Sequence, residues 1–181
     1  MILTDREIQI ALQQKLVRID PSPPPEAYAS TSVDLTLGRT FAVWEPQQGG
    51  PIRPGAPGFK YTSFLRNQRI EEKDLHILKH GEFVLAWTQE VVALPVHSRL
   101  AARVEGKSSL ARLGIGVHLT APTIHCGFSG PIQLEILNSG PNEIILDAGM
   151  PICQLIFELT SGTPEKGYQG LFLNQAPPKT G

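Results

Sequence analysis

Short strand-like segments, separated by turns rich in glycine and proline, crowd the chain after Gly114. Apolar residues recur in four of them, over residues 115–119, 131–137, 143–146 and 151–159, and the turns "NSGPN" and "DAGMP" stand between the later ones. Several short strands at this spacing are typical of a β-sandwich, a jelly roll or a barrel. The spacing therefore predicts a mainly β domain.

The first half of the chain adds one helix and further strands. Residues 4–16 combine the capping-box spacing of Thr4 and Glu7 with an apolar face, which predicts a short N-terminal helix. The run "SVDLTLG" alternates apolar and polar residues and predicts a half-buried strand that ends at Gly38. We also expect three more strands and one long loop, the strands over residues 82–88, 90–94 and 99–104 and the loop over residues 45–59.

Size and composition limit the classes of protein. The 181 residues suit a single domain over 1–181, with a helical N-terminal region at 1–20 and a C-terminal tail at 160–181 that can close a site. With a net charge of -1 and no long basic or apolar run, the chain is expected to bind neither nucleic acid nor a membrane. Two cysteines cannot build a disulfide framework, and the first residues do not resemble a secretion signal, so we expect a cytoplasmic protein with free thiols.

The segment "KSSLARLG" (107–114) is unusually polar. Ser108 or Ser109 can cap a short helix that Gly114 ends, and Lys107, Ser108 and Arg112 would then face outward together. Cations, hydroxyls and free backbone amides suit a phosphate group. A capped connector with solvated charges fits the same residues, so the segment by itself leaves both interpretations open.

The segment "PIQLEIL" places a carboxylate inside a predicted strand. Alternation puts Gln133 and Glu135 on one face of this strand and Leu134 on the other, together with its apolar neighbours. If the face of Glu135 is solvated, the carboxylate is an ordinary surface group. If that face lines a pocket, the carboxylate can shuttle protons. The strand pattern does not decide between these readings.

A zinc site is not expected. Zinc-dependent nucleobase deaminases carry H-x-E and P-C-x-x-C signatures, whereas His118 is followed by Leu119 and Thr120 and no C-x-x-C occurs. His125 and Cys126 are adjacent in sequence, so one metal ion would have difficulty using both. We therefore expect no metal-ligating residues.

The motifs "GKSSLARLG", "VHLTA", "GFSGPIQLEI", "NSG" and "AGMPICQLIF" follow one another between Gly106 and Phe157. In this order they resemble the dCTP deaminase family of the trimeric dUTPase superfamily. The resemblance implies a distorted jelly roll, or β-barrel, of the trimeric dUTPase type and a homotrimer with active sites between subunits. It also implies metal-independent hydrolytic deamination of dCTP, or of a related deoxycytidine nucleotide, to dUTP and ammonia. No cofactor would sit on the protein, and Mg²⁺ would arrive bound to the nucleotide triphosphate.

The resemblance also assigns roles by position. Glu135 matches the general acid–base, and Ser108 and Arg112 match its partners at the pyrimidine and the catalytic water. One carboxylate can serve in turn as the base for water and as the acid for N3 and the leaving amine. The implied substrate-binding residues are Lys107, Ser109, Leu110 and Ala111 in the phosphate-holding segment, Ala121 near the water, and Gln133 and Leu134 along the base and sugar.

Two features depart from the family pattern. His125 stands where dUTPases, and deaminases that also cleave the triphosphate, carry an aspartate that activates water; this argues against dUTPase activity. His125 can hydrogen-bond a sugar hydroxyl or be a plain surface histidine. The family closes its site with a tail carrying lysine, tyrosine and glutamine, and here "EKGYQGLFLNQ" offers Lys166 and Tyr168 as expected contacts, with glutamines in no certain register.

Other functions compete with deamination alone. A dUTPase or bifunctional deaminase–diphosphatase is disfavoured by His125, and a non-enzymatic nucleotide-sensing trimer is disfavoured by the joint presence of Ser108, Arg112 and Glu135. An unrelated β-sandwich binding module is disfavoured by the ordered motifs.

Overall fold

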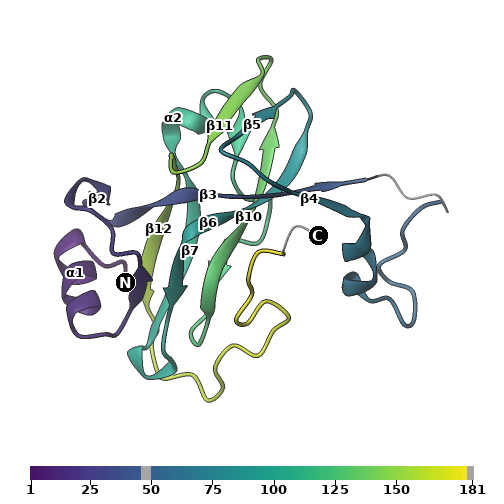
Figure 1. The fold of residues 1–181 in the computed structure, drawn as a ribbon. Helices are drawn as coiled ribbons and strands as arrows, with labels where there is room; N and C mark the ends of the chain where they lie inside the picture. The colour runs from purple at the N-terminus through teal and green to yellow at the C-terminus, as the bar shows by residue number, and fades with distance from the viewer. Residues whose placement is uncertain (46–49, 179–181) are drawn as a thin grey trace.

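A curled antiparallel sheet dominates the computed structural model, which describes residues 1–45 and 50–178 (Figure 1). Its strands follow the order β8 (Ile115–Gly116), β10 (Ser129–Asn138), β6 (Phe83–Ala93), β3 (Ser32–Trp44), β12 (Pro151–Leu159), β7 (Leu100–Gly106) and β9 (Thr123–Ile124). Three shorter strands join it, since β1 (Arg18–Asp20) pairs with β6, and β2 (Tyr28–Ala29) and β4 (Gln68–Glu72) pair with β3. A separate ladder joins β5 (Leu75–Leu78) to β11 (Ile144–Asp147). The predicted mainly β fold is confirmed.

The principal core fills the inside of the curled sheet. Alternate residues of β3, β10 and β12 point into it, and Leu35, Ile136 and Phe157 are fully buried there. This alternation is the period-2 pattern seen in the sequence, because successive side chains of a strand point to opposite faces.

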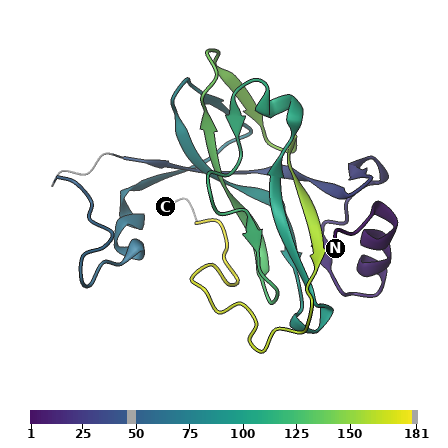
Figure 2. The same cartoon turned by 180° about the vertical axis from the view of Figure 1, so that it is seen from behind.

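The predicted N-terminal helix is confirmed as α1 (Asp5–Gln13). The backbone amide of Thr4 donates to the Glu7 carboxylate at 2.9 Å, which is one half of the expected capping box. Ile8 and Ala11 are buried against the core. The two views place α1 at one end of the molecule and η2 (Tyr61–Asn67) at the other, with β3 running between them (Figures 1 and 2).

Three strand boundaries differ from the prediction. β3 does not end at Gly38 but passes through it, because a glycine there lets the β6 backbone approach; a Cβ atom would lie 2.9 Å from the Trp87 carbonyl oxygen. The strands expected over 82–88 and 90–94 are one continuous β6. The strand expected over 115–119 shortens to the two residues of β8.

The remaining elements are short. They are η1 (Pro25–Ala27), η2, η3 (Val96–Ser98) and α2 (Ser108–Ala111). Of the loop expected over 45–59, residues 46–49 lie outside the described residues, and residues 50–59 lead without a helix or strand into η2. Every helix in the described ranges is too short or too polar to cross a lipid bilayer.

Candidate active site

Strand β10 presents the predicted acid–base group on the face opposite the main core. Leu134 is buried in the core, while Gln133 and Glu135 are half-buried on the other face, as the alternation predicts. In the register with β6, Gln133 lies opposite Trp87 and Glu135 lies opposite Leu85. Directly opposed residues share one face of a sheet, so the carboxylate lies among apolar neighbours.

A second apolar cluster covers this outer face. Ala42, Leu85 and Trp87 are buried there, and Trp44 and Ile70 pack against them. The face that carries Glu135 is therefore partly covered by apolar side chains and is not a plain solvated surface.

A backbone amide positions the Glu135 carboxylate. Leu119 N donates to Glu135 Oε2 at 3.0 Å, and the Glu135 amide donates to the Val117 carbonyl oxygen at 3.1 Å. Residues 117–119 follow the short strand β8, so the chain leaving β8 holds both the main chain and the side chain of Glu135. A hydrogen bond to a carboxylate restricts the rotation of the carboxylate. A group that transfers protons needs such a fixed orientation.

Five predicted residues surround one cavity of about 280 Å³, which we call the carboxylate pocket. They come from separate segments of the chain: Ala121, His125, Gln133, Glu135 and Tyr168. The pocket also includes residues that the sequence reasoning did not select, which are Thr123, Ile124, Phe128, Ile132, Phe172 and Gln175. The convergence places a carboxylate, an amide and an imidazole around a space at the small end of ligand pockets, which span about 300–1,000 Å³.

The C-terminal tail forms one wall of the carboxylate pocket. Tyr168 N donates to the Cys126 carbonyl oxygen at 2.9 Å, and the Tyr168 ring stacks on His125 with centroids 5.4 Å apart. Further along, Gln175 Nε2 donates to the Pro131 carbonyl oxygen at 2.8 Å. In both views the tail runs beside β10 (Figures 1 and 2).

Two glycines make room for this tail. Gly127 has φ of +90°, and a Cβ atom there would lie 2.7 Å from the Tyr168 nitrogen. Gly130 has φ of +144°, and a Cβ atom there would lie 2.9 Å from the Gln175 carbonyl oxygen. The glycines of "GFSG" were therefore the signal, present in the sequence, that another backbone passes here, and they bring Gln175 as well as Tyr168 to the site.

The α2 segment does not reach the carboxylate pocket of its own chain. Ser108, Ser109, Ala111 and Arg112 are exposed and lie outside the residues that line it. Lys107 is the N-cap of α2 and no side-chain hydrogen bond caps this helix, so the expected serine cap is wrong.

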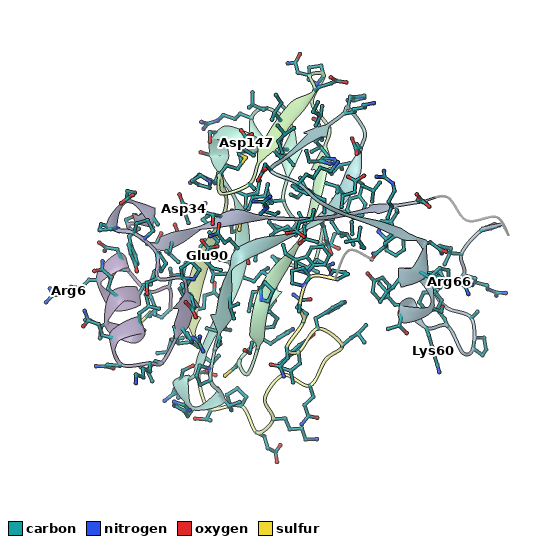
Figure 3. The ribbon with its side chains drawn as sticks, in the orientation of Figure 1. Arg6, Asp34, Lys60, Arg66, Glu90 and Asp147 are labelled. Carbon is teal, nitrogen blue, oxygen red and sulfur yellow. The ribbon has the colours of Figure 1, made fainter. Side chains whose placement is uncertain are left out.

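Four side chains lie elsewhere than predicted. Lys107 Nζ pairs with the Asp34 carboxylate of β3, so it is not a free phosphate-binding cation. Asp34 lies near the buried Glu90 of β6 (Figure 3). Leu110 packs against the core, and Leu134 is 1% exposed within it, so neither side chain can contact a substrate in the pocket. Lys166 is exposed and lies outside the pocket lining, unlike Tyr168.

Metal-ligating groups do not cluster in the described residues. Within 1–45 and 50–178, no group of three or more histidine, cysteine, aspartate or glutamate side chains is placed to hold an ion. Cys126 and Cys153 are buried free thiols.

Comparison with known proteins bears on the family. Residues 2–160 match the family model described as dCTP deaminase-like. A "dCTP deaminase, dUMP-forming" of Methanothermobacter thermautotrophicus is 37% identical over 99% of this chain and 92% of its own. A "dCTP deaminase" of Rhodospirillum rubrum is 36% identical over 93% of this chain and 87% of its own.

A solved structure agrees on the fold. The crystal structure of a 2′-deoxycytidine 5′-triphosphate deaminase from Agrobacterium tumefaciens has a TM-score of 0.65 and 23% identity, over 86% of this chain and 47% of that chain. This chain thus spans about half of that protein's length. The family model covers most of the chain, and the relatives match over nearly all of their length; the protein therefore belongs to the dCTP deaminase-like family.

Proposed function

We propose that the protein hydrolyses the amino group of dCTP, with Glu135 as the general acid–base and dUTP and ammonia as the products. The observation that supports the proposal is the carboxylate pocket, where Glu135 meets Ala121, His125 and other residues from separate segments of the chain. The relatives named as dCTP deaminases support the same substrate.

The chemistry needs one group that first accepts and then donates a proton. Glu135 would take a proton from water as the water oxygen bonds to C4 of cytosine, and would pass that proton to N3. In the tetrahedral intermediate a proton then moves from the new hydroxyl, through Glu135, to the amine. The C4–N bond breaks, ammonia leaves with the electron pair of that bond, and the C4 carbonyl of uracil forms. A carboxylate held by Leu119 N in a pocket that Ala121 also lines suits this sequence of steps.

A homotrimer would complete the site. The described residues that line the carboxylate pocket of one chain include no lysine or arginine, so they offer nothing cationic for a triphosphate. Ser108 and Arg112 lie exposed on α2 of the same chain. Leu113, which follows α2, and Leu119, whose amide binds Glu135, are about half exposed, at 51% and 49%. Two exposed leucines here favour a neighbouring subunit against this surface. We therefore propose that α2 of a second copy faces the carboxylate pocket and supplies Ser108 and Arg112.

The products depend on His125. We propose deamination without loss of pyrophosphate, because a histidine stacked on Tyr168 replaces the water-activating aspartate expected in bifunctional enzymes. Mg²⁺ would enter as part of the substrate, bound to the triphosphate. The alternative is a bifunctional enzyme that forms dUMP, which the name of the Methanothermobacter relative favours.

The test is incubation with dCTP and with dUTP, with ammonia and pyrophosphate measured separately. Ammonia without pyrophosphate is expected from dCTP, and nothing from dUTP. The Glu135→Gln variant should lose turnover by more than about a hundredfold while still binding dCTP, because the amide keeps the shape but cannot shuttle protons. Near-normal turnover in that variant would show that another group is the base, and pyrophosphate from dUTP would establish the bifunctional alternative.

A further inference from the structure

A second cavity of about 300 Å³, which we call the apolar annex, adjoins the carboxylate pocket. The two cavities share Gln133, Phe172 and Gln175 in their walls, so they are direct neighbours. The annex lies between the outer face of the sheet, η2 and residues 171–178 of the tail.

Aromatic contacts join the three walls of the annex. Tyr61 of η2 meets Trp44 of β3 edge-on at 6.3 Å between ring centroids, and meets Phe172 of the tail edge-on at 6.2 Å. Such edge-to-face pairs contribute beyond the area that they bury. Packed aromatic rings therefore hold the three walls of the annex together.

The lining chemistry excludes a phosphate as the occupant. Most of the lining side chains are apolar, among them Leu65, Ile70, Trp87, Leu171 and Ala176, and the polar ones are uncharged in the part of the chain that is described. The cations at the ends of η2, Lys60 and Arg66, project outward into solvent (Figure 3).

The annex begins immediately beside the reacting carboxylate. Gln133, in its wall, precedes Glu135 by two residues on the same strand face, which is about 7 Å along the strand. Burial raises the pKa of the Tyr61 hydroxyl, a hydrogen bond with Gln68 partly opposes this, and the negative charge of Glu135 raises the pKa as well. If a cytosine ring atom reacts at Glu135, an atom bonded to it in the ring therefore lies on the side of the annex.

The structure of cytosine indicates which atom next to the reacting carbon faces the annex. The reacting atom C4 is bonded to the amine, to N3 and to C5. The amine and N3 exchange protons and must face Glu135, whereas C5 carries only hydrogen in cytosine and forms the apolar edge of the ring. An apolar space next to the carboxylate therefore matches the C5 side of the base, and neither the sugar hydroxyl nor the phosphates match it.

Resting on the proposed function, we infer that the apolar annex receives an apolar substituent at C5 of the base, so that the protein deaminates 5-substituted deoxycytidine triphosphates as well as dCTP. A methyl group fits easily, and the volume admits a propynyl group. A carboxylate pocket with no neighbouring cavity would exclude substituents at C5, because overpacking a closed pocket is unfavourable.

The experiment measures kcat/KM of the full-length protein for dCTP, 5-methyl-dCTP and 5-propynyl-dCTP by ammonia release. The 5-methyl substrate should be used within about threefold of dCTP, whereas a closed pocket rejects one extra carbon by about 10-fold or more. Ala176→Leu and Thr62→Leu fill the annex from opposite walls and should each lower the ratio of 5-methyl-dCTP to dCTP efficiency by about tenfold. Thr163→Leu, at an exposed tail position outside both cavities, should leave that ratio unchanged.

The outcomes separate this inference from the proposed function. Turnover of dCTP with rejection of both 5-substituted substrates would overturn the annex assignment and leave the deaminase intact. Turnover of 5-methyl-dCTP that neither filling variant alters would place the methyl group elsewhere and also overturn it. No ammonia from any substrate would refute the proposed function, and the inference with it. Thermal melting of each variant identifies any that fails to fold, and the second filling variant then decides.

Discussion

Mixed trimers made from two inactive variants test where Arg112 acts. Glu135 lines the carboxylate pocket, whereas Arg112 is exposed on α2 and lies outside that pocket in the same chain. If each site joins Glu135 of one subunit to Arg112 of the next, then Glu135→Gln and Arg112→Ala remove different halves of it. Each variant alone is expected to be inactive, because every site in its trimer lacks one group.

The expected recovery follows from counting sites. In a random one-to-one mixture, a site is intact only when one subunit brings the native Glu135 and its neighbour brings the native Arg112. Each condition is met half of the time, so about one quarter of the wild-type rate should return. The assay co-expresses the two variants, or unfolds and refolds them together, and measures ammonia release from dCTP.

A matched control tests whether the recovered activity requires a native Glu135. Mixing Glu135→Gln with the Glu135→Gln, Arg112→Ala double variant offers no native carboxylate, so no recovery is expected. If the first mixture stays as inactive as this control while forming mixed trimers, the shared site is refuted. Activity in Arg112→Ala alone that equals the wild type would show that Arg112 takes no part.

Two further predictions concern stability and the tail. Burial holds the pKa of His76 below its ordinary value of 6.5, and Glu82 only partly opposes this effect. As the pH falls, His76 is therefore protonated in the unfolded chain before it is protonated in the folded protein. The free energy of unfolding should therefore decrease below about pH 6.5, by at most about 1.4 kcal/mol per pH unit. His76→Phe keeps a ring stacked on Phe41 and should reduce this dependence of the unfolding free energy on pH, as measured by urea titrations between about pH 7 and 5.5. An unchanged pH dependence in the variant would show that other groups cause it. Gly127→Ala puts a Cβ atom against Tyr168 N in a left-handed backbone, so the tail should detach, with faster proteolysis of the tail and a loss of about tenfold or more in kcat/KM; an intact, protease-resistant tail would contradict this.

Local patterns carried much of the fold. The spacing of Thr4 and Glu7 predicted α1 because a capping box involves only residues within one turn. The alternation in "PIQLEIL" placed Gln133 and Glu135 on one face of β10 because the side-chain period of a strand is two. The same reasoning placed the end of β3 wrongly at Gly38, because this glycine is needed for the close approach of the β6 backbone. The residues next to Gly38 in the sequence do not indicate that another strand lies there.

The site divides in the same way. The sequence by itself determined which residue types stand at which spacing, and hence that Glu135 faces away from the core. Only the tertiary structure decided that this face is covered, because its cover comes from Trp87 on β6 and from Phe172 and Gln175 of the tail, far apart in the chain. It also decided that Lys107 is paired with Asp34 and that Leu134 is core. The physical reason is that a pocket is a property of surfaces brought together by packing, and no segment encodes its partner's position.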